Sequence, residues 1–336
     1  MRTVRIAFLL ASLMAAGSTL PAQAQGPSPK GPGPAWASLA PVPSVLGPGL
    51  GGVEGMSVAS VGNEIIAAFG FDNGFGDTAT TRIYDIASDT WSLGSSGPGV
   101  SSEGAGVAHG GLFYNIGGRG PGFNANWAYD PVTDAWNAGL APLPTGRNGL
   151  GAAVVGNSIY AIGGRTSGGG PCSDVGPGVL TTVERYDIAT DTWTTVAPLL
   201  APRQDLAATA VGGKIYVFGG CDMFGSIVGD VDVYDPTTDT WSPAPTDMPN
   251  PRASLYAVAA KGGTVYVIGG WDGFSPGLST NDSYKVATDT WTTGLPPMPT
   301  PRAESGAVGH GGKVYIVGGG QPGFGLSVDA NEVFKP

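Results

Sequence analysis

Side chains that can do chemistry recur at fixed places in this 336-residue chain. Fifteen residues before the glycine that ends a short apolar run stand Glu103, Asp205 and Glu304. Arg203 and Arg302 stand two residues before the second and third of these carboxylates. Carboxylates can bind a cation such as Ca²⁺ or serve as acid and base, and a guanidinium can hold a carboxylate through paired hydrogen bonds. The pattern indicates a binding or a catalytic site.

Arginines form a second recurrent set. Four of them precede an apolar run, namely Arg147, Arg203, Arg252 and Arg302, and two follow a pair of glycines, namely Arg119 and Arg165. Trp271 follows a glycine pair in the same way, beside Asp272 and Phe274. An aromatic ring beside a carboxylate suits carbohydrate binding and equally suits packing within a loop.

The elements that must position these residues repeat six times. An aromatic residue recurs at Tyr84, Tyr129, Tyr186, Tyr234, Tyr284 and Phe334. A tryptophan recurs at Trp36, Trp91, Trp136, Trp193, Trp241 and Trp291. A glycine ends an apolar run at Gly70, Gly118, Gly164, Gly220, Gly270 and Gly319. Each unit of about 50 residues holds four short runs rich in Val, Ile, Tyr and Thr, which predicts four strands.

These markers resemble the kelch repeat, in which an apolar run ending in Gly-Gly, a Tyr-Asp pair and a Trp follow one another. The resemblance covers residues 35–336, and its first copy departs with Phe69 in place of a glycine. It implies an all-β fold, a six-bladed β-propeller of four-stranded blades, in which packing around an axis buries both faces of each blade. In the fourth unit we expect strands at 205–211, 214–219, 229–235 and 240–244. We expect the tyrosines and tryptophans to pack in the core and between blades.

The first and last markers predict how the ring closes. Trp36 has no strands before it, and Phe334 has no tryptophan after it. We therefore expect residues 35–39 to form the outer strand of the blade made by residues 304–335.

The N-terminal segment has the features of a secretion signal. Arg2 and Arg5 precede an apolar stretch at 6–16, and Ala22-Gln23-Ala24 fits the cleavage site. We expect residues 1–24 to be a signal peptide, 25–34 a flexible tether and 35–336 the propeller. The protein is then exported to a periplasm or to the extracellular space.

In a propeller, the loops entering the first strand and those leaving the second strand share one end of the ring. All six arginines named above are expected at that end. In kelch adaptor domains arginines at these two positions bind acidic peptide motifs, so the resemblance implies a face that binds carboxylates or sugars.

The three carboxylates fall in alternate blades, so they would form a rough three-fold ring at the mouth of the central channel. The intervening blades place Gly55, Gly149 and Ser254 there. The ring could hold Ca²⁺ or supply acid and base groups. Alternatively, Arg203 with Asp205 and Arg302 with Glu304 simply form ion pairs, because residues two apart point the same way on a strand.

The two cysteines, Cys172 and Cys221, fall in loops after the second strand of adjacent blades. In an exported protein this predicts a disulfide between them, and two free thiols are the alternative. Neither loop contains a histidine, so we expect no metal site there and no cofactor beyond the Ca²⁺ considered above.

Composition excludes several classes of function. The net charge is −10, with 16 basic and 26 acidic residues, which argues against binding to nucleic acid or to anionic membrane. No apolar stretch is long enough to predict a transmembrane helix.

Two functions remain open from the sequence. The first is an exported monomeric binding module that recognises a protein, peptide or glycan through the arginine-bearing face. The second is a sugar-active enzyme, similar at fold level to the periplasmic kelch mutarotase of sialic acid. It would use Glu304 with Arg302, or Asp205 with Arg203, at the channel mouth.

Overall fold

Short strands joined by glycine- and proline-rich turns make up nearly all the regular structure. A computed structural model describes residues 33–44, 51–72, 76–321 and 326–336, and residues 34–336 form one unit. The expected signal peptide, 1–24, and nearly all of the expected tether, 25–34, lie outside the described residues. The described residues also contain three 3-10 turns, η1 (Gly120–Gly122), η2 (Gly176–Gly178) and η3 (Val286–Thr288). No helix among them is long and apolar enough to cross a membrane.

The described residues form six four-stranded antiparallel sheets. The first holds β3 (Ser57–Val61), β4 (Glu64–Ala68), β7 (Thr81–Asp85) and β8 (Thr90–Gly94). The second holds β9 (Ala105–His109), β10 (Leu112–Ile116), β11 (Asn126–Asp130) and β12 (Ala135–Asn137). The third holds β13 (Gly151–Val155), β14 (Ser158–Ile162), β15 (Val183–Asp187) and β16 (Thr192–Val196). The fourth holds β17 (Ala207–Val211), β18 (Lys214–Phe218), β19 (Val231–Asp235) and β20 (Thr240–Pro243). The fifth holds β21 (Tyr256–Ala260), β22 (Thr264–Ile268), β23 (Asn281–Lys285) and β24 (Thr290–Thr292). The sixth holds β25 (Gly306–His310), β26 (Lys313–Val317), β29 (Asn331–Lys335) and β1 (Ala35–Ser38).

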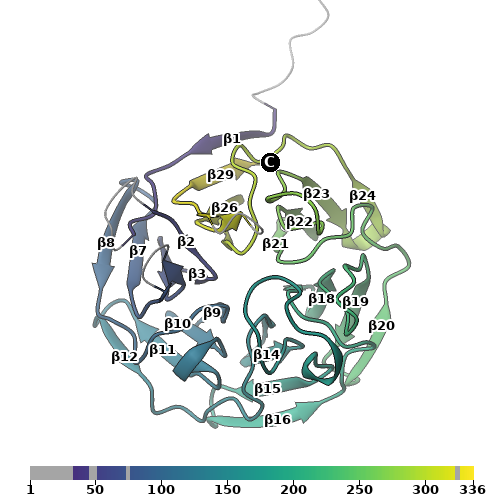
Figure 1. The fold of residues 1–336 in the computed structure, drawn as a ribbon, viewed down its shortest axis with the longest axis horizontal. Helices are drawn as coiled ribbons and strands as arrows, with labels where there is room; N and C mark the ends of the chain where they lie inside the picture. The colour runs from purple at the N-terminus through teal and green to yellow at the C-terminus, as the bar shows by residue number, and fades with distance from the viewer. Residues whose placement is uncertain (1–32, 45–50, 73–75, 322–325) are drawn as a thin grey trace, which may run out of the picture. The chain divides into compact units, whose positions relative to one another are not determined.

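The sheets surround a common axis as the blades of a β-propeller (Figure 1). The first strands of successive sheets contact one another in a cycle that runs β3, β9, β13, β17, β21, β25 and back to β3. The sixth sheet combines the first described strand with β25, β26 and β29 from the C-terminal part of the chain, because β1 pairs with β29. Trp36 lies opposite Phe334 in this pairing.

The two ends of the propeller differ in their loops. We call one the loop end, because it carries the segments that enter each first strand and those that join second to third strands, such as 163–182 and 219–230. The other, the turn end, carries tight turns such as 110–111 and 131–134. The remaining short strands belong to loop-end segments: β2 (Val53–Glu54), β5 (Phe71–Asp72), β6 (Gly76–Asp77), β27 (Gly320–Gln321) and β28 (Leu326–Ser327).

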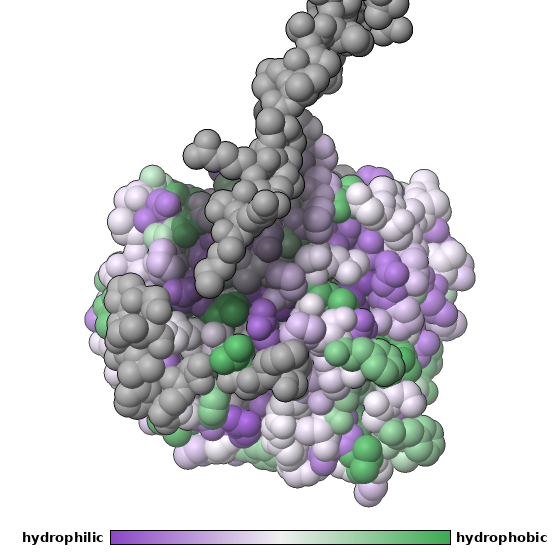
Figure 2. Space-filling view, turned by 45° about the horizontal axis from the view of Figure 1, so that its top comes forward, coloured by the Kyte–Doolittle hydropathy of each residue, from purple (hydrophilic) through white to green (hydrophobic). Residues whose placement is uncertain are grey.

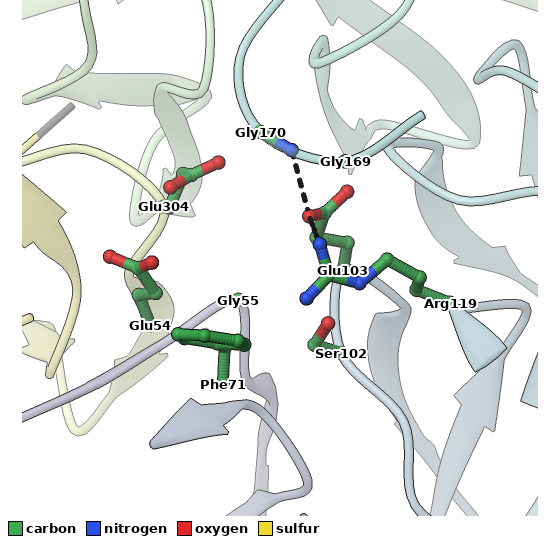
Figure 3. Close-up of a pocket in the computed structure, with 9 residues that line it drawn as sticks. All are labelled: Glu54, Gly55, Phe71, Ser102, Glu103, Arg119, Gly169, Gly170 and Glu304. Atoms are coloured by element: carbon green, nitrogen blue, oxygen red, sulfur yellow. Dashed lines mark hydrogen bonds and ion pairs between the residues drawn. The ribbon is translucent and has the colours of Figure 1, made fainter. Parts of the chain in front are cut away.

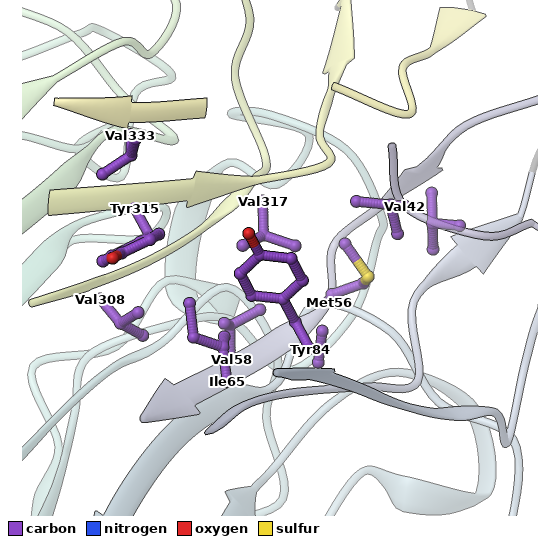
Figure 4. Close-up of a cluster of buried hydrophobic side chains, with 11 residues drawn as sticks. Val42, Met56, Val58, Ile65, Tyr84, Val308, Tyr315, Val317 and Val333 are labelled. Carbon is purple, nitrogen blue, oxygen red and sulfur yellow. The ribbon is translucent and has the colours of Figure 1, made fainter. Parts of the chain in front are cut away.

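The hydrophobic core lies between neighbouring sheets. Figure 4 shows one such layer, where Val58 and Tyr84 of the first sheet face Tyr315 and Val317 of the sixth. All four side chains are buried. A blade therefore has no complete core of its own and depends on its neighbours.

The recurrent tyrosines and tryptophans link the blades, as expected from the sequence. In the fourth sheet the rings of Tyr234 and Trp241 lie 4.9 Å apart. The Tyr234 hydroxyl donates to Asp239 Oδ1 at 2.6 Å, and Trp241 Nε1 donates to the carbonyl oxygen of Ala197 at 2.8 Å. Since Ala197 follows the outer strand of the preceding blade, the tryptophan joins two blades at their rim.

Strand boundaries in the fourth unit match the expected ones within two residues. The largest differences are at the starts of the first and third strands, which begin at Ala207 and Val231 instead of 205 and 229. The predicted start of the first strand at residue 205 is wrong, because Asp205 has a φ of +53°, which is incompatible with an extended strand.

Candidate functional site at the loop end

A ring of six residues surrounds the axis where the chain enters the first strand of each blade. All six have a positive φ, between +48° and +61°: Gly55, Glu103, Gly149, Asp205, Ser254 and Glu304. Each backbone N–H donates to the carbonyl oxygen of the equivalent residue in the preceding blade, over 2.7 to 3.3 Å, and the cycle includes Gly55 N to Glu304 O. The left-handed conformation, which is unfavourable for residues other than glycine, aims these N–H groups around the ring. The three carboxylates do share one ring.

The arginines two residues before this ring do not pair with its carboxylates. The sequence-based alternative of Arg203–Asp205 and Arg302–Glu304 pairs assumed an extended strand, and it is wrong for that reason. A positive φ at Asp205 and Glu304 turns their side chains away from the direction that two-residue alternation would give. The carboxylate and the arginine that the sugar-active enzyme would combine, Glu304 with Arg302 or Asp205 with Arg203, therefore do not pair with each other.

These arginines pair instead with acids on the third strand of their own blade. The pairs are Arg147 with Glu184 at 2.7 Å, Arg203 with Asp232, Arg252 with Asp282 at 3.0 Å, and Arg302 with Glu332 at 2.6 Å. The four guanidinium groups are at most 1% exposed. Burial lowers the pKa of Arg147, Arg203 and Arg252 despite their acidic partners.

The expectation of an exposed arginine face is therefore wrong at these four positions. Each guanidinium also donates to backbone oxygens, as Arg252 Nη2 does to Val267 O at 2.9 Å and Arg302 Nη2 to Ile316 O at 3.1 Å. The Nη donors of each guanidinium thus hold a blade together from within, while its Nε–H has no hydrogen-bond partner among the described residues.

Arg165 lies between two of the ring carboxylates, Glu103 and Asp205, and is also fully buried. Its Nη1 donates to both oxygens of Asp205, at 2.6 and 2.7 Å, and its Nη2 pairs with Glu103. Burial acts to lower the pKa of Arg165, but Asp205 and Glu103 raise it above its ordinary value. One internal cation thus neutralises part of the charge of two ring carboxylates.

Arg119 is the member of the predicted set that reaches solvent, with 30% of its side chain exposed. It pairs with Asp77 at 2.8 Å and with Glu103 at 3.3 Å. Its guanidinium carbon lies 5.4 Å from the centre of the Phe71 ring, a cation–π distance. Burial would lower the pKa of Arg119, but these acids raise it.

The loop after β14 crosses the channel mouth and is tied down by a disulfide. Cys172 and Cys221 are bonded, as the sequence predicted, with Cα atoms 5.5 Å apart. The backbone N–H of Gly170 donates to Glu103 at 2.9 Å, and that of Cys172 donates to Asp205 at 2.8 Å. The loop therefore covers two of the three ring carboxylates.

The third ring carboxylate, Glu304, faces a cavity of about 220 Å³. Figure 3 shows Glu54 and Glu304 on one side of this cavity, Glu103 and Arg119 on the other, and Phe71 near Glu54. Burial, and then the negative charge of Glu54, raise the pKa of Glu304 well above its ordinary value. Burial also raises the pKa of Glu54. The cavity is thus lined by two carboxyl groups, those of Glu54 and Glu304, whose negative charges repel each other.

Two further cavities lie on the axis. One of about 140 Å³ lies at the ring, where Met56, Leu150, Leu206 and Leu255 form an apolar collar. The other, of about 270 Å³ and lined by small residues of the first strands such as Ala59 and Ala208, lies further along them.

Large apolar side chains project from the loop end of three consecutive blades. Val175, Phe224 and Phe274 are 64%, 76% and 95% exposed, and we call them the loop surface. Aspartates fix the turns that present the two rings: Phe224 N donates to Asp222 Oδ1 at 2.8 Å, and Phe274 N to Asp272 Oδ1 at 3.0 Å.

The loops that carry the loop surface support one another. Gly176 N donates to Met223 O at 2.6 Å, which joins the third-blade loop to the fourth. A Cβ atom placed on Gly273 would lie 3.5 Å from Ile227 Cδ1, so the fifth-blade loop lies against the fourth. Trp271, at the base of the fifth loop, is half-buried, and its backbone pairs with Ala253.

Neither metal ligands nor histidines gather at this site. Among the described residues, no group of three His, Cys, Asp or Glu side chains is placed to hold a metal ion. His109 and His310 end the first strands of their blades at the turn end, where they contact Asn157 and Ser60.

Sequence reasoning missed Glu54 and the acids of the third strands. Glu54 has no acidic counterpart in the other units, so no repeat pattern marks it. The third-strand acids did have a signal: an acid stands two residues before the recurrent aromatic only in the four units that have an arginine before the first strand. Because the acid and the arginine occur together in the same four units, the sequence indicates that the two side chains contact each other within a blade.

Comparison with known proteins decides the family. Residues 107–319 match the model of the KLHDC2/KLHL20/DRC7 Kelch-repeats domain, which covers more than half of the chain. The chain belongs to the kelch-repeat family. It is 34% identical to Kelch-like protein 25 of Xenopus tropicalis over 151 residues, 43% of this chain and 25% of that protein. It is 29% identical to Kelch-like protein 35 of Mus musculus over 178 residues, 52% of this chain and 28% of that protein.

A plant protein with kelch repeats is also similar to this chain. The F-box/kelch-repeat protein At1g16250 of Arabidopsis thaliana is 34% identical over 135 residues, 37% of this chain and 34% of that protein. The kelch chain thus spans about a quarter to a third of the length of these relatives. Kelch-repeat domains generally serve as protein-interaction modules.

Proposed function

We propose that this kelch-repeat protein is an exported interaction module that binds a protein partner through the loop surface. The observation that carries the proposal is the exposure of Val175, Phe224 and Phe274 on three loops that brace one another. Aromatic side chains held on rigid turns are favoured anchors in protein interfaces. Figure 2 shows one face of the molecule, on which hydrophobic residues lie in separate patches among hydrophilic ones.

Export is part of the proposal and has its own support. The N-terminal segment 1–24 has the charge and hydrophobicity of a signal peptide, and the Cys172–Cys221 disulfide suits an oxidising compartment. Mass spectrometry of the protein recovered from the cell envelope or medium tests this point. We expect a chain beginning at Gln25 with its disulfide intact; a cytoplasmic chain that retains Met1 would contradict export.

Site-specific photo-crosslinking tests the binding surface. A photoreactive phenylalanine analogue is placed at Phe224 or Phe274, and at Val132 as the matched control. Val132 is 90% exposed but lies at the turn end. In extracts of the exporting cell, we expect the same discrete protein adduct from positions 224 and 274, lost when the other phenylalanine is changed to serine. An equal adduct from position 132, or binding only to glycans, would contradict the proposal.

A further inference from the structure

The cavity beside Glu304 is lined by residues of the first, second, third and sixth blades, and it adjoins a repeat position that carries an arginine in two of the six blades. The residue after the glycine pair is Arg119 in the second blade and Arg165 in the third, and both reach ring carboxylates. The equivalent residue of the sixth blade is Gly320. It lies against Glu54 so closely that a Cβ atom there would collide with the carboxylate. In the sixth blade the Glu54 carboxylate of the adjoining first blade thus lies beside a glycine, at the position where the second and third blades carry an arginine.

Arginines act on the two carboxyl groups at this position only from a distance, Arg119 opposing the rise in the pKa of Glu54 and Arg165 opposing that of Glu304. Among the described residues, neither Glu54 nor Glu304 forms an ion pair with an arginine or lysine, whereas Glu103 has two such pairs. The undescribed stretches after residue 32 contain no lysine or arginine. Ser327 donates a hydrogen bond to Glu54, which leaves acceptor positions open on a carboxylate.

We propose that this cavity binds an alkylammonium group, held between the carboxylates of Glu54 and Glu304. An ammonium has three N–H donors and no acceptor, which matches two facing carboxylates. The Phe71 ring also lines the cavity and can contact the carbon chain that carries the ammonium. The cavity of about 220 Å³ admits a single aliphatic amine or a lysine side chain, and not a folded domain.

The charges around the cavity favour a cation over an anion. The acids Glu54, Glu103, Glu304, Asp77 and Asp205 outnumber the bases Arg119 and Arg165. Both bases already pair with acids, so an incoming carboxylate would find no free guanidinium. Burial and like charge raise the pKa of Glu304, and a bound cation would relieve that repulsion.

The inference is independent of the protein-binding proposal, because the ammonium can sit on a free amine or on a lysine of a polypeptide. Titration calorimetry of the full exported chain at pH 8 distinguishes the two. The probes are n-butylammonium, N-acetyl-lysine methylamide, and N-acetyl-norleucine methylamide as the uncharged control. Equal binding of the two amines indicates that a free amine suffices, whereas binding of the lysine derivative alone indicates a polypeptide ligand.

Variants locate the binding. Glu304→Gln and Glu54→Gln should each weaken amine binding at least fivefold, while Glu64→Gln, a matched change in β4, should leave it within twofold. Gly320→Ala is a second variant, in which the added methyl group displaces the Glu54 carboxylate, and it should also weaken binding. Binding of norleucine as tight as lysine, equal binding by Glu304→Gln, or binding of Ca²⁺ but of neither amine would overturn the proposal.

Discussion

At the scale of single residues, the arginines show why recurrence does not by itself indicate function. Arg147, Arg203, Arg252 and Arg302 recur because each blade uses one to bind its third strand from within. A buried ion pair of this kind is strongly sensitive to the loss of one partner, since the other charge is left unpaired in the interior.

The Arg252–Asp282 pair gives the first prediction. Arg252→Met should lower the free energy of unfolding by about 3–5 kcal/mol, because it leaves Asp282 buried without its cation. The double variant Arg252→Met with Asp282→Leu should recover more than half of that loss. Arg119→Met, at a half-exposed pair, should change stability by about 1 kcal/mol or less. Urea unfolding measures all three, and an equal effect of Arg252→Met and Arg119→Met would contradict the structural role.

The Glu304 carboxyl group gives a prediction about pH. Its pKa in the folded state is raised well above the ordinary value of 4.5, by burial and by the charges of Glu54, Glu103 and Asp205, with Arg165 opposing them. The folded protein therefore holds a proton that the unfolded chain releases, so this group stabilises the fold fully below about pH 4.5. The contribution is lost as the pH rises through the raised pKa.

Glu304→Gln removes the titrating carboxyl group and so tests whether its ionisation causes the loss of stability at higher pH. Thermal unfolding of the wild type, followed from pH 4.5 upward, should show a loss of stability that is smaller in the variant. Glu64→Gln serves as the control, because it makes the same change in β4, away from the cavity that Glu304 faces. A steeper loss in Glu304→Gln than in the wild type would contradict the direction of the shift.

At the scale of elements, the strands were predictable because each is specified locally. A run of Ile, Tyr and Val between two glycine pairs predicted β18, and the Asp-Thr-Trp marker predicted β20, both almost to the residue. The conformation of the ring residues was not predictable in this way. A sequence indicates a positive φ only where glycine occurs, as at Gly55 and Gly149, and not at Glu103 or Asp205. The side-chain partners of the arginines required contacts across a blade that periodicity does not specify.

The tryptophans of the outer strands allow a matched comparison of one hydrogen bond. Trp241 Nε1 donates to Ala197 O at 2.8 Å, whereas Trp291 Nε1 is buried and has no hydrogen-bond partner among the described residues. Trp241→Phe should therefore destabilise the fold by about 1 kcal/mol more than Trp291→Phe. Equal losses in chemical denaturation would show that the indole N–H does not link the blades.

At the scale of the whole molecule, the pairing of β1 with β29 joins the two ends of the chain. A chain that begins at Ala40 lacks β1 and exposes the edge of β29, which can pair with another molecule. We expect this chain to unfold at a lower temperature and to aggregate, while a chain that begins at Pro34 and keeps β1 should behave as the wild type. Size-exclusion chromatography and thermal unfolding compare them, and identical behaviour would show that β1 is dispensable.

At the same scale, the two ends of the propeller offer a partner different surfaces. The turn end has tight turns, while the loop end has the braced loops with Val175, Phe224 and Phe274, and beside them the cavity of Glu54 and Glu304. The sequence indicated that the loops at this end differ in length and content, but it assigned recognition to six arginines, five of which the fold buries.

Hydrogen–deuterium exchange with the crosslinked partner tests recognition at the loop end most directly. Exchange is measured by mass spectrometry on the exported chain alone and in complex with the protein captured at Phe224 and Phe274. The account predicts slower exchange in the complex at residues 166–179, 221–228 and 271–278, with the turns at 110–111 and 131–134 unchanged. Protection confined to those turns would contradict it.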